Sequence, residues 1–168
     1  MTDFLNKLST YNIFNYLLPG VVFVVLNEFV TNIPLLQKDI VTGVFFYYFL
    51  GLIISRVGSI IIEPFLKKIG FVKFAEYSDY VSAERNNDFI KILSEVNNMY
   101  RTLASTLFCL FIFKLYDLIC KKISFFHENG IYIIIIFLFV LFLFAYRKQT
   151  SYITSRVAKH KEEQGKNV

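Results

Sequence analysis

Four apolar runs, each close to the length of a bilayer-spanning helix, constrain this 168-residue chain more than any other feature. They are Ile13–Val30, Ile40–Ile62, Leu103–Cys120 and Ile131–Tyr146. A bilayer core needs roughly 20 apolar residues per helical span. The 31 charged residues lie almost entirely between the runs, a segregation typical of membrane proteins. We therefore predict an all-α membrane protein with four transmembrane helices.

The runs divide the chain into four parts. Residues 1–62 hold the N-terminal flank and the first two spans, and residues 63–102 form a helical segment outside the membrane. Residues 103–146 hold the last two spans, and residues 147–168 form a basic tail. This division leaves little chain for a soluble catalytic domain.

Positive charges predict which ends of the spans face the cytoplasm. One Lys lies in the N-terminal flank, and six Lys or Arg lie in each of the segments 63–102 and 147–168. The two short loops hold three together. Because Lys and Arg are enriched in cytoplasmic loops, we expect both termini and the helical extensions inside. The bias toward Ile, Phe, Asn and Lys is typical of an AT-rich genome, so we expect a bacterial inner membrane.

The spans differ in character. Pro19 and Gly20 interrupt the first, which predicts either a hinge or a fixed bend; alternatively, Asn12–Leu18 is an interfacial helix and the span begins near Pro19. The second carries a stripe of small residues that favours close helix packing: Gly51, Ser55, Gly58 and Ser59. The fourth is bulky and apolar on all sides, so we expect it at the lipid-facing edge.

Four charged residues fall inside the runs: Glu28, Arg56, Lys114 and Asp117. A charge at the centre of a membrane helix costs at least about 2.5–3.5 kcal/mol, so such residues often mark function. They either line an ion path or serve as interfacial charges with one pair, Lys114 and Asp117, on a shared helix face. We favour the second interpretation.

The sequence predicts two helices in the segment outside the membrane, residues 63–102. Glu63-Pro64 is expected to break the chain after the second span, and Asn87 or Asp88 to cap a helix that continues through Cys120. Residues 146–163 are expected to extend the fourth span. Apolar residues recur at helical spacing in the segment 63–102, and we expect six of them to anchor a protein partner: Phe74, Tyr77, Phe89, Leu93, Val96 and Tyr100.

No motif for catalysis or metal binding occurs in the sequence. It holds no HExxH, no CxxC and no glycine-rich phosphate loop. Cys109 and Cys120 lie 11 positions apart within one helix, too far to bond to each other, and we expect both to pack. We therefore expect no enzyme, no cofactor and no metal site.

The stretch Leu8–Gly20, LSTYNIFNYLLPG, resembles the opening of small four-span proteins from bacterial anti-phage defence operons, among them the membrane subunits of Kiwa systems. The resemblance covers this stretch, the chain length and the four-span layout. It implies an oligomeric inner-membrane protein that senses phage attack or membrane disturbance and holds a cytoplasmic DNA-binding effector. It carries over no individual functional residue.

Two functions are consistent with these features. The first is a non-enzymatic sensor and scaffold that oligomerises and docks a cytoplasmic effector. The second is a pore-forming or membrane-disrupting effector whose path is lined by the four intramembrane charges. Expected partners are membrane lipid, further copies of the chain and an effector protein. The basic patches lie next to the membrane, where anionic lipid is a simpler partner than nucleic acid.

Overall fold

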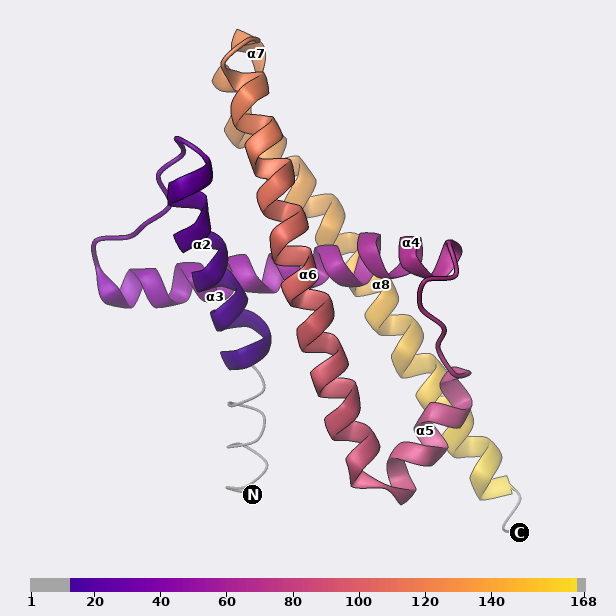
Figure 1. Cartoon of the computed structure of the whole chain (residues 1–168). Coiled ribbons are helices and arrows are strands. Elements are labelled where there is room, and N and C mark those ends of the chain that lie inside the picture. Colours follow the sequence, from indigo (N-terminus) through magenta and orange to yellow (C-terminus); the bar gives the residue numbers. More distant parts are fainter. Residues whose placement is uncertain (1–12, 166–168) are drawn as a thin grey trace.

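The computed structural model describes residues 13–165, which are almost entirely helical. Four of the helical segments, Ile13–Val30, Ile40–Lys68, Asp88–Cys120 and Gly130–Lys161, are long and apolar enough to cross a membrane. This confirms an all-α protein with four candidate spans. In chain order the elements are η1 (Ile13–Leu17), α2 (Leu18–Val30), α3 (Ile40–Val57), η2 (Gly58–Ile62), α4 (Glu63–Lys68), α5 (Tyr77–Asn86), α6 (Asp88–Cys120), α7 (Ser124–Glu128) and α8 (Gly130–Gly165) (Figure 1).

Side-chain caps start two of the long helices. The Asn87 side chain accepts a hydrogen bond from the backbone N–H of Phe89 at 2.9 Å and begins α6. The Asp39 carboxylate accepts one from the N–H of Thr42 at 2.7 Å and begins α3, and this bond lowers the pKa of Asp39. Each cap satisfies a donor that has no partner inside the helix.

The prediction of one helix from Asp88 to Cys120 is confirmed. Its 33 residues make it about 50 Å long, so it extends well beyond its apolar run. The fourth apolar run likewise continues into the tail as a single helix, α8. The third and fourth apolar runs are therefore joined to the charged segments beside them by uninterrupted helices.

The break predicted at Glu63-Pro64 does not occur. The chain stays helical from Ile40 to Lys68 because the turn η2 is wider than an α-helical turn. There the backbone N–H of Glu63 donates to the carbonyl of Gly58, five residues back instead of four. Pro64 has no N–H to donate, and the change in bonding pattern occurs one residue before it.

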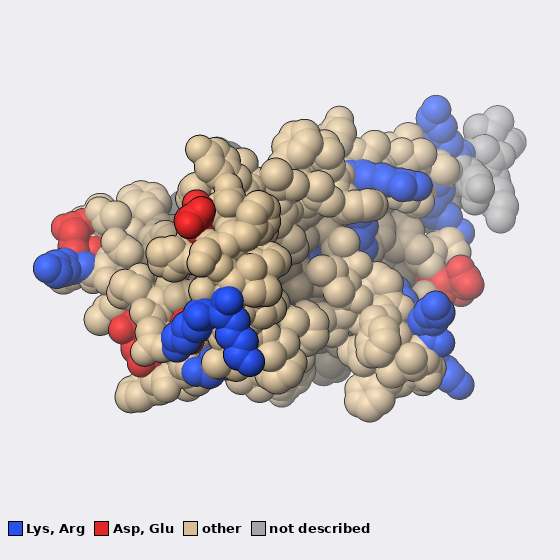
Figure 2. All heavy atoms as spheres, turned by 90° about the horizontal axis from the view of Figure 1, so that it is seen from above, with Lys and Arg blue, Asp and Glu red and all other residues tan. Residues whose placement is uncertain are grey.

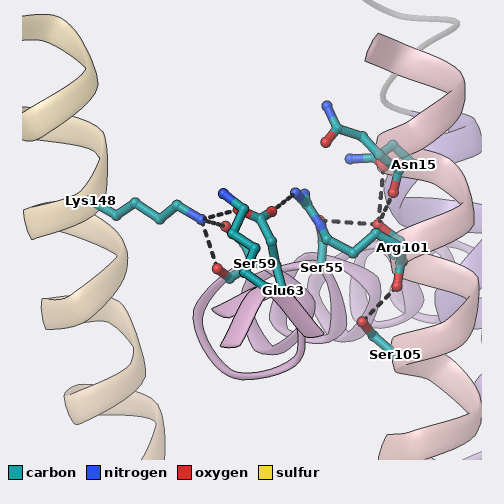
Figure 3. Close-up of polar contacts among 10 residues, drawn as sticks. Asn15, Ser55, Ser59, Glu63, Arg101, Ser105 and Lys148 are labelled. Atoms are coloured by element: carbon teal, nitrogen blue, oxygen red, sulfur yellow. Dashed lines mark hydrogen bonds and ion pairs between the residues drawn. The ribbon is translucent and has the colours of Figure 1, made fainter. Parts of the chain in front are cut away.

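The helix formed by α3, η2 and α4 lies across the others. In Figure 1, α2, α6 and α8 run roughly from top to bottom, and the helix from α3 to α4 runs from left to right. Figure 3 views this crossing helix nearly end-on, between α6 and α8. The contacts agree. Ser55 and Gly58 of the crossing helix meet α6 at Thr102 and Ser105. Three candidate spans therefore share one direction and the fourth crosses them.

Two glycines permit the crossing of α2 and α3. A Cβ atom on Gly51 would lie 1.7 Å from the carbonyl oxygen of Tyr16, and one on Gly20 would lie 1.8 Å from that of Tyr47. The two backbones touch, which only residues without a side chain allow. Pro19, the other proposed hinge residue, is also buried here.

Most of the apolar surface remains exposed. A small core forms around Phe23, Val24, Ile54 and Leu110. Between residues 131 and 146, by contrast, Leu141 is the only buried residue, as expected for a span at the edge of the structure. Seen from above, most of the surface is uncharged, and the charged side chains lie in separate groups, some of them at the left and right margins of the view (Figure 2). Such a surface suits lipid rather than water.

We predict that Gly51→Ala destabilises the fold by about 1–3 kcal/mol, because the added methyl group overpacks the contact with Tyr16. Thermal unfolding in detergent, followed by circular dichroism, measures the loss. Gly43→Ala in the same helix is the matched control, since its Cβ would meet only the Tyr47 ring and the Gln37 side chain at ordinary distances. Equal stability of the two variants would contradict the close crossing.

Candidate functional site: an ion network between α4, α6 and α8

Two of the four intramembrane charges come together. Lys114 Nζ lies 3.9 Å from Asp117 Oδ2 and donates to the backbone carbonyl of Val30. Asp117 is buried and also lies 3.0 Å from Lys121 Nζ, and it accepts from Asn32 at 3.4 Å. This cluster joins α6 to the end of α2.

The other two intramembrane charges have separate partners. Glu28 is exposed and accepts a hydrogen bond from the N–H of Leu35 at 3.1 Å, in the loop after α2. Arg56 donates to the hydroxyl of Tyr16 at 3.2 Å. The four residues therefore do not converge on one site.

A different carboxylate, Glu63, is the centre of the most connected polar site. Glu63 is only 6% exposed, yet its carboxylate forms ion pairs with three cations. Oε2 lies 2.5 Å from Arg101 Nη1, and Oε1 lies 3.2 Å from Lys148 Nζ (Figure 3). Oε1 also lies 3.2 Å from Lys67 Nζ. We call these four residues and Ser59 the Glu63 network. Three positive charges around one negative charge leave it net positive.

Lys148 binds a carbonyl that the local sequence leaves free. Its ammonium donates to the backbone oxygen of Ser59 at 2.7 Å and to the Ser59 hydroxyl at 2.8 Å. In an α-helix the Ser59 carbonyl would accept from Glu63, but that N–H bonds to Gly58 instead. The next residue, Pro64, has no N–H. Together with the carboxylate, the three donors of Lys148 all have an acceptor.

Buried hydroxyl and amide groups lie next to the network. The Thr102 hydroxyl lies 2.8 Å from the carbonyl of Asn98, 3.2 Å from the amide oxygen of Asn15 and 3.4 Å from the Ser55 hydroxyl. Ser105 donates to the Arg101 carbonyl at 2.7 Å. These bonds satisfy polar groups that would otherwise cost free energy in an apolar interior.

The small-residue stripe predicted for close packing lies in these contacts. Gly51, Ser55, Gly58 and Ser59 are all buried. A Cβ on Gly58 would lie 2.2 Å from the Ser105 hydroxyl, so this glycine too allows a close helix contact. Ser59 supplies two of the three acceptors of Lys148.

The predicted docking residues lie mainly on exposed surface. Tyr77 is the exception, because its ring stacks on Tyr152 of α8 at 5.3 Å and is half-buried. Lys67 Nζ sits 4.0 Å from the centre of the Phe74 ring. The remaining side chains are exposed by 38% to 65%: Phe74, Phe89, Leu93, Val96 and Tyr100.

Sequence reasoning missed the Glu63 network although a signal was present. Glu63 directly follows the second apolar run, Arg101 lies two positions before the third and Lys148 lies two positions after the fourth. The predicted topology places all three at the same membrane face. A single acidic residue among basic residues at one level predicts an ion pair, whereas we counted these charges only for orientation.

The network joins α4, α6 and α8. Its carboxylate is engaged by cations, and the described residues 13–165 contain no group of three or more His, Cys, Asp or Glu that could hold a metal ion. Comparison with known proteins gives no family: no protein-family model, no curated protein and no solved structure matches the chain.

We predict that Glu63→Gln destabilises the fold by about 3 kcal/mol, because it leaves partly buried cations without their counter-charge. Lys148→Met should also destabilise it, and the double variant should lose less than the two single losses added. Unfolding in detergent measures all three. Glu128→Gln, at an exposed carboxylate, is the matched control and should have no effect. Strict additivity would contradict a direct coupling.

Proposed function

We propose that the chain is a non-enzymatic membrane sensor and scaffold that oligomerises and docks a cytoplasmic effector protein. The observation that carries this proposal is the continuity of α6. One helix contains both the apolar run Leu103–Cys120 and, before it, an exposed row of apolar side chains. A displacement of the span therefore moves the row directly.

The Glu63 network supports a relay of this kind. It ties α6, through Arg101, to α4 and to Lys148 of α8 at the level where the apolar runs end. Beyond Lys148 along the chain, α8 also packs against α5, because the Tyr152 ring stacks on Tyr77. A change in helix packing within the membrane would alter these shared contacts and reach the cytoplasmic helices.

The row on α6 supports docking of a protein. Phe89, Leu93, Val96 and Tyr100 follow one another at spacings of four, three and four, so they lie on one helix face. All four side chains are exposed. A row of apolar side chains facing water is unfavourable and is typical of an interaction surface.

A role in anti-phage defence in the bacterial inner membrane rests on the resemblance of Leu8–Gly20 to the Kiwa membrane subunits. Residues 8–12 of this stretch lie outside the described residues. Under this proposal the effector docks on α6, and oligomerisation uses the exposed apolar surface of the spans.

A pore-forming effector, the alternative function, needs charged side chains along one path. Glu28, Arg56 and the Lys114–Asp117 pair instead engage three separate sets of partners within the chain. This separation favours the scaffold. Unchanged ion flux after neutralisation of Lys114 and Asp117 would count further against the pore.

We predict that Leu93→Asp, and separately Val96→Asp, abolishes capture of a stoichiometric partner, because a carboxylate in the contact would be desolvated. The measurement is a mild-detergent pull-down from native cells, analysed by mass spectrometry. Lys91→Asp is the matched control: it adds the same side chain at an exposed position on the other side of the helix.

Loss of partner capture is distinguishable from loss of folding, because circular dichroism and the mass of the homo-oligomer are measured on the same samples. Capture of the same partner by both variants and by the control would show that the docking surface lies elsewhere. A homo-oligomer with no partner, even for the unchanged chain, would favour the pore.

A further inference from the structure

The segment from Phe65 to Phe74 comprises the last four residues of α4 and the chain that follows it. It combines exposed apolar side chains with lysines. Lys67, Lys68 and Lys73 are exposed residues, spread among the apolar ones. Four of its six large apolar residues are exposed by 50% to 76%: Phe65, Ile69, Phe71 and Phe74. In the described structure, Phe71 is the most exposed large hydrophobic residue outside the four candidate spans.

A defined turn holds this arrangement. Gly70 has a φ of +74° and its N–H donates to the carbonyl of Lys67 at 3.1 Å, while the N–H of Phe71 donates to that of Leu66 at 3.0 Å. This pair of bonds is the Schellman motif that ends many helices. The turn therefore fixes where Phe71 leaves the helix, with its ring in the open.

The Glu63 network fixes the level of the segment. Glu63, Arg101 and Lys148 each lie within two residues of the end of an apolar run, and Arg101 and Lys148 both contact Glu63. Their contact therefore marks the boundary between the apolar and charged parts of the chain. Lys67 belongs to this network and also lies over the Phe74 ring. The exposed segment thus begins at the boundary.

We propose that residues 65–74 form an anchor for anionic lipid, with the Phe and Ile side chains inserted below the headgroups and the lysines at the lipid phosphates. Charge favours this occupant, because the segment contains three lysines and no acidic residue. Position favours it as well, since the segment begins inside the candidate span Ile40–Lys68 and includes the chain that directly follows it. Interfacial segments of this composition bind through apolar insertion plus attraction to anionic lipid.

The anchor would also connect lipid charge to helix packing. Lys67 is shared between Glu63, at 3.2 Å, and the Phe74 ring. A lipid phosphate that draws Lys67 away lowers the positive charge around Glu63 and leaves Arg101 and Lys148 as its partners. This inference concerns a lipid surface and holds whether or not α6 docks an effector.

The test uses the absence of tryptophan from the chain. Phe71→Trp provides a single fluorescent probe in the full chain, reconstituted in phosphatidylcholine vesicles with or without phosphatidylglycerol. We expect blue-shifted emission, loss of fluorescence with brominated acyl chains and protection from acrylamide, all stronger when phosphatidylglycerol is present. Adding Lys68→Gln and Lys73→Gln should remove the dependence on phosphatidylglycerol, and both lysines lie outside the Glu63 network.

Two further probes set the scale. Phe137→Trp, in the exposed apolar run of α8, reports contact with acyl chains, and Phe89→Trp reports the surface of α6 beyond the boundary. Emission and acrylamide quenching of Phe71→Trp equal to those of a water-exposed tryptophan would overturn the proposal. Protection from acrylamide without quenching by brominated lipid would show a protein cover instead, and equal burial in both vesicles would overturn the requirement for anionic lipid.

Discussion

The rest of the structure depends on neutralising one buried carboxylate. A lone ionised Glu63 in an apolar environment would be strongly unfavourable, so its cations must come within contact distance. They come from α6 and α8 as well as from its own helix, and they thereby fix how these three helices meet. The crossing of α3 over α2 adds a second constraint through Gly20 and Gly51. Together the ion contact and the glycine contact determine a structure with a small apolar core.

Features set by nearby residues could be predicted. Run length and composition identified the four candidate spans, and the pair Asn87 and Asp88 marked the start of α6, where Asn87 is the cap. The prediction at Glu63-Pro64 was wrong because the rule for proline assumes α-helical bonding throughout. At η2 the bonding already skips one residue, so the proline falls where the helix tolerates it. No local sequence pattern predicts this change from α-helical to wider bonding.

The candidate site was less accessible to sequence reasoning. The Lys114–Asp117 pair follows from a spacing of three, whereas Glu63 meets Arg101 and Lys148 across 38 and 85 positions. The crossing direction of α3 was equally hidden, because small residues indicate close approach but not its angle. Both features depend on which helices become neighbours, and apolar runs of similar composition leave that choice open.

The wide turn η2 works as a one-residue insertion that the helix absorbs. Each residue of an α-helix turns the following ones by about 100°, so removing the extra residue would rotate everything beyond it by that amount. Glu63 would then face away from Arg101, and the aromatic and lysine side chains after it would change sides as well. The direction in which side chains beyond Ile62 point is thus set by five residues, Gly58–Ile62. A single deletion there would redirect the whole end of the helix while leaving its composition almost unchanged.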